Sequence, residues 1–263
     1  MKEIVFIKYG GSIITDKSRP QSVSVDCIRQ LNEQVKYLHS ISSYLFIIGN
    51  GGGAFGHYFA MKYGLGCDKE ISPEAVFGIC EGKNGNNYLN HLIVDDLLNI
   101  GVSAASVRIS TPYLLLENLK AWEELCLYLG KDILPVLYGD ILIVENEECR
   151  IVSTEQAFLD LARYIAHRKK DTFKIRKFIF CTDTDGIKDK IGNRIPKISA
   201  DFYDDSLFWN SDQVYDVTGG MKKKVEISLE LAKIAPVQII NGKKKDAVIQ
   251  AVAGEEIGTQ IGI

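Results

Sequence analysis

Short apolar runs followed by glycine are the main feature of the hydrophobic pattern along the chain. They cover residues 4–7, 44–47, 133–138, 178–181 and 237–240. Continuous apolar runs of this length are typical of strands that are buried on both faces of a parallel sheet. The pattern therefore predicts a buried sheet whose strands end in glycine turns.

Segments with apolar residues at helical spacing separate these runs. Helices are predicted over residues 25–39, 89–100, 114–129 and 153–165, and after the glycines at 219 and 220. Ser153 is a suitable N-cap for the fourth of them. Residues 104–109 indicate a further strand, and residues 141–144 and 150–152 indicate a hairpin. Strands that alternate with helices predict the α/β class.

Residues 70–92 do not fit one pattern. Ser72 and Pro73 are typical of a helix start. Gly78, Gly82 and Gly85, with the polar residues at 83–87, instead indicate a polar, flexible patch. A surface loop and a part of a substrate pocket or lid are equally good interpretations.

Composition and charge limit the classes of function. The 263 residues suit one large α/β domain or two small ones, with 169–172 as the best internal boundary. A net charge of -3 favours neither a nucleic-acid nor a membrane partner, so any phosphate site must be local. The six cysteines form no CxxC pair, which predicts reduced thiols in the cytoplasm. The N-terminal apolar run is too short for a signal peptide.

Three glycine turns carry the candidate chemistry. Gly51, Gly52 and Gly53 follow a predicted strand and precede a helix that contains His57. Glycine lets the backbone approach an anion, and the N–H groups of the loop and the helix start then converge on it. The sequence therefore predicts a phosphate site at this loop.

Lysines lie beside the other two turns. Lys8 and Lys17 bracket the turn of Gly10, Gly11 and Ser12. A lone lysine is usually a solvated surface residue, but two around a glycine turn favour phosphate contacts. Lysines 222–224 follow Gly219 and Gly220 on the first turn of a predicted helix, where positive charge opposes the helix dipole. That local cost favours a function for at least one of them.

Phosphoryl transfer depends mainly on positioning and positive charge, which these turns supply. Asp183 and Asp185 follow the strand over 178–181 and could organise a nucleotide, a lysine or hydrated magnesium. The chain lacks GxxxxGK[ST] and the protein-kinase motifs, so it is neither a P-loop enzyme nor a protein kinase. It also lacks GxGxxG followed by an acid at a strand end, so dinucleotide binding is weakly supported.

The motifs occur in the order found in the amino acid kinase superfamily, which the chain resembles from residue 4 to residue 263. They are Lys8-x-Gly10-Gly11-Ser12, Gly51-Gly52-Gly53, Thr182-Asp183-Thr184-Asp185-Gly186 and Asp216-Val217-Thr218-Gly219-Gly220-Met221-x-x-Lys224. Thr15-Asp16-Lys17 and Gly53-Ala54-Phe55-Gly56-His57 look most like the isopentenyl phosphate kinases. Fosfomycin kinase also carries the second of these patterns.

The resemblance implies a three-layer αβα sandwich with a mainly parallel central sheet, in a cytoplasmic homodimer. It implies one domain over residues 1–263, with an acceptor-binding half at 1–172 and an ATP-binding half at 173–263. ATP and Mg²⁺ would be the cofactors, and a small-molecule phosphate or phosphonate would be the acceptor. No dedicated metal ligands are expected in the chain.

The resemblance also implies residue roles. Lys8 and Lys224 would contact the ATP phosphates, Lys17 the transferring phosphoryl group and His57 the acceptor phosphate. The other residues expected to bind the nucleotide are Gly10, Gly11, Ser12, Gly53, Asp183, Asp185 and Gly220. The other residues expected to bind the acceptor are Gly52, Thr154 and Glu155.

The sequence departs from the superfamily pattern in three places. Asn50 stands where a histidine is common. Thr154 replaces a glycine that approaches the acceptor, and Glu155 replaces an aspartate that orients the catalytic lysines. Residues 83–87, expected beside the acceptor, are polar, and polar groups facing an apolar tail would be costly.

Three hypotheses follow. The first is an ATP-dependent kinase that makes a diphosphate from a phosphate monoester, with isopentenyl phosphate as the leading acceptor. The second is a fosfomycin-like kinase of a phosphonate or another small polar phosphate. The third is a non-catalytic nucleotide-binding storage or regulatory protein. The replacement of the family aspartate by Glu155 suggests this hypothesis.

Overall fold

An eight-stranded sheet forms the centre of the computed structural model, which describes residues 1–16, 18–65, 71–109, 119–143, 149–199 and 220–262. In spatial order its strands are β3 (Ala104–Arg108), β4 (Leu134–Tyr138), β2 (Leu45–Asn50), β1 (Lys2–Tyr9), β7 (Phe173–Thr182), β9 (Val237–Asn241), β10 (Thr259–Ile261) and β8 (Lys197–Ile198). Neighbouring strands pair in parallel except β9 and β10, which are antiparallel. The expected mainly parallel sheet is confirmed.

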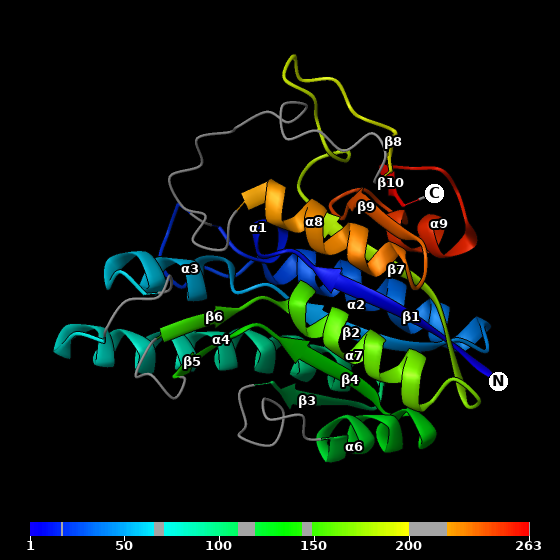
Figure 1. The fold of residues 1–263 in the computed structure, drawn as a ribbon, viewed down its shortest axis with the longest axis horizontal. Helices are drawn as coiled ribbons and strands as arrows, with labels where there is room; N and C mark the ends of the chain where they lie inside the picture. Colours follow the sequence, from blue (N-terminus) through cyan, green and yellow to red (C-terminus); the bar gives the residue numbers. More distant parts are fainter. Residues whose placement is uncertain (17, 66–70, 110–118, 144–148, 200–219, 263) are drawn as a thin grey trace.

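Helices cover both faces of this sheet (Figure 1). One face packs against α6 (Leu119–Gly130), α7 (Thr154–Arg168) and α8 (Gly220–Ala232). The opposite face packs against α1 (Gly11–Ile14), α2 (Val25–Ile41), α4 (Pro73–Asn99) and α9 (Ala247–Ala253). Alternate residues of β1 enter the two cores: Phe6 enters the first, and Val5 and Ile7 enter the second. The three-layer αβα sandwich is therefore confirmed.

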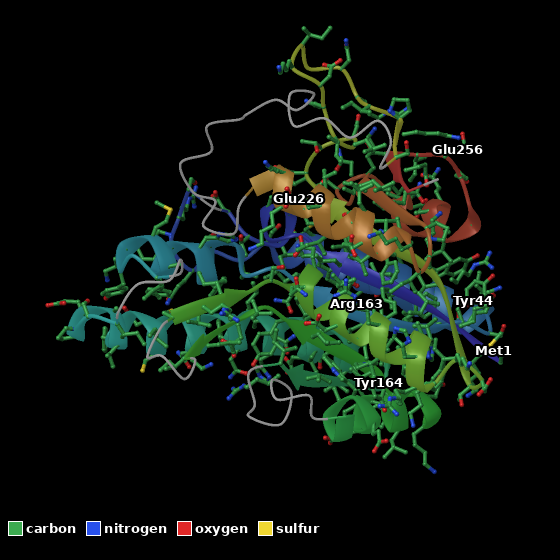
Figure 2. All side chains as sticks on the ribbon, in the orientation of Figure 1. Met1, Tyr44, Arg163, Tyr164, Glu226 and Glu256 are labelled. Carbon is green, nitrogen blue, oxygen red and sulfur yellow. The ribbon has the colours of Figure 1, made fainter. Side chains whose placement is uncertain are left out.

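The helices α7 and α8 lie side by side on the face that Figure 2 turns toward the reader, with Arg163 labelled on α7 and Glu226 on α8. An ion pair between Arg163 and Glu230, 3.2 Å long, joins the two helices. Ser153 caps α7 as expected, because its hydroxyl oxygen accepts a hydrogen bond from the Gln156 N–H at 3.2 Å. Both helices begin beyond the carboxyl ends of the central strands.

A small antiparallel hairpin, β5 (Asp140–Ile143) and β6 (Cys149–Val152), lies beside α3 (Gly53–Lys62) and α4. The hairpin is confirmed over these residues, while residue 144 of the expected strand lies outside the described residues. Residues 114–118 of the helix predicted over 114–129 lie outside them as well. The hairpin, α3 and α4 enclose a third apolar cluster, separate from the two cores of the sheet.

The prediction of a polar, flexible patch or surface loop around residues 78–87 is wrong. These residues lie in the middle of α4, one continuous helix of 27 residues. A Cβ atom at Gly78 would lie 2.4 Å from the Tyr63 ring, and one at Gly82 would lie 2.5 Å from Ile141. The glycines therefore give α3 and the hairpin room to approach α4, and this packing outweighs their low helix propensity.

Candidate active site

A cleft lies at the carboxyl ends of the central strands, where α1, α3 and α7 begin. Orphan N–H groups at helix starts make such a place suitable for anions. Most of the residues predicted for the site line the cleft: Lys8, Gly10, Gly11, Ser12, Gly52, His57, Thr154, Glu155 and Lys224. Residues far apart in the sequence thus meet in one place, as the α/β sheet predicts.

The two N-terminal glycine turns contact each other beneath this cleft. A Cβ atom at Gly11 would lie 2.5 Å from the backbone of Gly53. Thr15 links the turns, because its hydroxyl donates to Gly11 O at 2.6 Å and accepts from Ala54 N at 2.9 Å. Gly53 is buried with a positive φ of 48°, and it does not belong to the cleft lining. The visible role of these two glycines is therefore close backbone packing.

A buried ion pair joins the end of β1 to the start of α7. The Lys8 ammonium donates to the Glu155 carboxylate, and their side chains are 10% and 8% exposed. Burial raises the pKa of Glu155, but the charges of Lys8 and then Lys224 outweigh it and hold that pKa below its ordinary value. Glutamate is long enough to reach Lys8 from the α7 start, so the replacement of aspartate keeps a carboxylate between the lysines.

Thr154 closes the gap between three chain segments. Its hydroxyl donates to Asn50 O at 2.6 Å and accepts from Gly139 N at 3.0 Å. A Cβ atom at Gly49 would lie only 2.5 Å from the Thr154 methyl carbon, so Thr154 also packs tightly against the end of β2. The hydroxyl proton is therefore committed to Asn50, so Thr154 borders the cleft as a structural tie and offers no hydroxyl proton to a ligand.

One wall of the cleft is apolar. Ala60, Ile141 and Ile151 line it, and they belong to or pack against the cluster enclosed by α3, α4 and the hairpin. Of the polar stretch at 83–87, Asn86 lines the cleft, whereas Lys83 bonds Asp140 at 3.1 Å and Ile141 O at 2.8 Å. The expectation that this stretch lies beside the acceptor thus agrees with the position of Asn86, whereas its longest side chain binds the hairpin.

Two predicted carboxylates lie away from the cleft. Asp183 is exposed. Asp185 lies in a second pocket, where Lys244 contacts it at 2.8 Å and the Asn241 amide donates to it at 2.9 Å. Those hydrogen bonds, that of Lys244 first, lower the pKa of Asp185. Gly220 is the first residue of α8, and Lys17 and Gly219 lie outside the described residues.

Sequence reasoning missed several residues of the cleft. Lys223 lines it beside Lys224, and Ile141 and Ile151 line it from the hairpin, whereas Asn86 was expected beside the acceptor only as part of the stretch at 83–87. The lysine run at the start of α8 was a signal for Lys223. A helical pattern through the glycines of α4 would have been the signal for Asn86, because it places Asn86 on the same face as Gly78, Gly82 and Gly85.

The described residues contain no group of three or more His, Cys, Asp or Glu side chains that could hold a metal ion. No helix among them is long and apolar enough to cross a membrane.

Comparisons with known proteins agree with this geometry. A family model described as "Amino acid kinase family" matches residues 3–241. The isopentenyl phosphate kinase of Thermoplasma acidophilum is 30% identical over 261 residues, covering 98% of this chain and 100% of that enzyme. The isopentenyl phosphate kinase of Methanocaldococcus jannaschii is 29% identical over 270 residues, covering 98% of each. A crystal structure of the T. acidophilum enzyme, a product complex, matches with a TM-score of 0.74 at 26% identity, covering 99% of this chain and 100% of that one.

Proposed function

Because the chain belongs to the amino acid kinase family and is an ATP-dependent kinase, we propose that it phosphorylates isopentenyl phosphate. An oxygen of the acceptor phosphate attacks the γ-phosphorus of ATP and forms a new P–O bond. The bond from that phosphorus to the β–γ bridging oxygen breaks, and ADP leaves with the electron pair. The products are ADP and a diphosphate.

The shape and chemistry of the cleft support this acceptor. One side carries Lys8, Lys224 and the helix starts, which suit phosphate groups. The opposite side carries Ala60, Ile141 and Ile151, which suit a short apolar chain. The single observation that carries the proposal is this apolar wall, since a wholly polar acceptor would leave it without a complementary partner.

Each polar residue then has a role. Lys8 and Lys224 hold the ATP phosphates, and Glu155 orients both ammonium groups from the α7 start. His57, on the first turns of α3, hydrogen-bonds the acceptor phosphate. Lys17, which lies outside the described residues, stabilises the transferring phosphoryl group. These roles require little covalent chemistry from the protein, as phosphoryl transfer generally does.

Three further features complete the proposal. Magnesium bound to the ATP phosphates would supply charge neutralisation beside Lys8 and Lys224. The acceptor binds to the half of the chain at 1–172 and ATP to the half at 173–263, which supplies Lys223 and Lys224 to the cleft. The protein is a cytoplasmic homodimer, and the exposed Val76 and Phe77 of α4 are apolar surface that a second copy would cover.

A panel of acceptors with magnesium ATP tests the proposal. The panel contains isopentenyl phosphate, dimethylallyl phosphate, fosfomycin and a small hydroxylated phosphate monoester, and kcat/KM is measured for each. We expect the two apolar monoesters to have the highest values. Turnover of a polar acceptor without turnover of either isoprenoid would reject isopentenyl phosphate and favour a fosfomycin-like kinase. ATP binding without any transfer would favour a storage or regulatory protein.

A further inference from the structure

Asn86 is the one polar residue of α4 that lines the cleft, in a helix whose residues are all described. Only 6% of its surface is exposed. The family motifs in this chain assign it no role. It projects from the middle of α4 toward Gly52 and Gly56 at the start of α3, next to His57.

The amide group of Asn86 has a defined orientation. Its Nδ2 donates to Gly139 O at 3.2 Å. The reversed orientation would place Oδ1 against that carbonyl oxygen, which is repulsive. The bond to Gly139 therefore turns Oδ1 toward the glycine loop.

The Oδ1 atom lies against two glycines of that loop. A Cβ atom at Gly52 or at Gly56 would lie 2.6 Å from it. At Gly56, all three of the nearest atoms to such a Cβ belong to Asn86. Among the described residues, Oδ1 has no hydrogen-bond donor, so its visible contacts are with the glycine backbone, where weak Cα–H···O interactions are possible.

Burial of a carbonyl oxygen without a donor is costly, and such a group in a native structure calls for a reason. A leucine at this position would avoid the cost but would not bond Gly139. The hydrogen bond from Asn86 to Gly139 O joins α4 to the segment that Thr154 also holds, through Gly139 N. Asn86 thus connects the His57 turn to the tie beside Glu155.

We propose that Asn86 is a positioning residue for the acceptor phosphate: through its contact with Gly56 it fixes the turn of α3 that presents His57. This inference rests on the proposed role of His57 as the ligand of that phosphate. The described contacts of Asn86 are with Gly52, Gly56 and Gly139, and they include neither Lys8 nor Lys224. Its loss therefore weakens binding of the acceptor and leaves binding of ATP unchanged.

The experiment compares Asn86→Asp with Asn84→Asp. Asn84 is two residues earlier on α4, is exposed and does not line the cleft, so it controls for the charge change. Asn86→Asp loses the donor to Gly139 and places a negative charge beside the anion site. We expect the acceptor KM to rise at least tenfold for Asn86→Asp with the KM of ATP within twofold, and both constants to stay within twofold for Asn84→Asp. Equal rises in the two KM values, or no rise, would overturn the proposal.

A double substitution gives a second test that does not depend on the charge. Gly56→Ala places a methyl group against Asn86, so we expect it alone to raise the acceptor KM. Asn86→Ala removes the obstacle, and the double variant should then have a lower acceptor KM than Gly56→Ala alone. Purely additive effects would show that the contact does not position the turn.

His57→Ala separates this inference from the function on which it rests. If His57→Ala leaves the acceptor KM and kcat unchanged, the proposed role of His57 fails. If His57→Ala weakens the acceptor step while Asn86→Asp and the double variant behave like the control, the role of His57 stands and that of Asn86 is rejected.

Discussion

The two sides of the cleft are built in opposite ways. On the side of β1, α7 and α8, Lys8 and Glu155 form a buried ion pair next to Lys224. On the side of α3, α4 and the hairpin, Ile141 and Ile151 present hydrocarbon. Charge is thus concentrated where phosphates would lie. Among the polar residues of α4, Lys83 binds the hairpin, and Asn86 lines the cleft beside these apolar side chains.

This difference teaches that local polarity in the sequence does not report the polarity of a binding surface. Lys83 has a long polar side chain, yet its ammonium is bound to Asp140 and to the Ile141 carbonyl. Ile141, which follows Asp140 in β5 and pairs with Ile151 of β6, supplies part of the apolar wall instead. Four substitutions can break or sharpen the contrast between the two sides.

The largest effect is expected at the ion pair. Glu155→Gln leaves the Lys8 charge buried without its carboxylate, which should lower the free energy of unfolding by about 3–5 kcal/mol. The measurement is urea unfolding at pH 7. The double variant Lys8→Met with Glu155→Leu should recover most of this loss but remain inactive. Activity in that double variant would mean that the pair serves the fold alone.

The same pair predicts a pH dependence with a definite sign. Because the folded pKa of Glu155 lies below its ordinary 4.5, the carboxylate stays ionised throughout the neutral and mildly acidic range. Its contribution to stability is present above pH 4.5 and is lost as the pH falls through the lowered value. Unfolding experiments from pH 7 to pH 3 should show this loss in the wild type and not in Glu155→Gln.

The next largest effect is expected at His57. Its replacement by alanine removes a charged hydrogen bond to the acceptor phosphate and should weaken the acceptor step by roughly 2–4 kcal/mol. Steady-state kinetics with the acceptor varied at saturating ATP measures this. An unchanged acceptor KM and kcat would remove His57 from the acceptor side.

A smaller effect is expected on the apolar wall. Ile151→Asn places a polar group against the apolar tail and should reduce kcat/KM for isopentenyl phosphate by roughly 1–3 kcal/mol. Ile143→Asn is the matched control, because Ile143 lies in the same hairpin but is exposed. A higher kcat/KM of Ile151→Asn for a hydroxylated acceptor would further support the contrast. Equal losses of kcat/KM in both variants would argue that Ile151 does not contact the acceptor tail.

The smallest effect is expected on the α8 lysines. Lys223 and Lys222 are neighbours on one helix turn and both are exposed, but Lys223 lines the cleft. Lys223→Ala should raise the KM of ATP a few-fold, as expected for a solvent-screened charge, and more at low salt. Lys222→Ala should leave it unchanged. Equal changes in the KM of ATP for the two variants would mean that the lysines act only through the overall positive charge of the helix start.

The sheet and its order of elements could be predicted from the sequence, because buried parallel strands give continuous apolar runs. The run at residues 4–7 became the centre of β1, and the Ser153 cap became the start of α7. The meeting of Lys8, His57 and Glu155 followed from the resemblance together with the rule that strand ends converge. The resemblance implied an acid at position 155 that orients the lysines, but the direct pairing of the longer Glu155 with Lys8, 147 residues away, could not be predicted.

The helix α4 shows why other parts of the structure could not be predicted from the sequence. Gly78, Gly82 and Gly85 carry low helix propensity, and only the proximity of Tyr63, Ile141 and Phe55 explains them. Those neighbours come from α3 and the hairpin, so their effect is tertiary. Asp185 illustrates the same point, because its partners are Asn241 at the end of β9 and Lys244 just after it, which hold it in a different pocket.

The pairing of β1 with β7 has a mechanical consequence. These strands come from the two proposed halves of the chain, yet they pair from Lys2 and Phe173 to Tyr9 and Cys181, with one register shift after Ile4. The two proposed halves are therefore joined by backbone hydrogen bonds between β1 and β7. They cannot separate as two rigid bodies without breaking these bonds. We expect substrate entry and product release to use motions of elements outside the sheet, such as the hairpin of β5 and β6. Substitutions in the hairpin should then change the rates of these steps without changing the sheet.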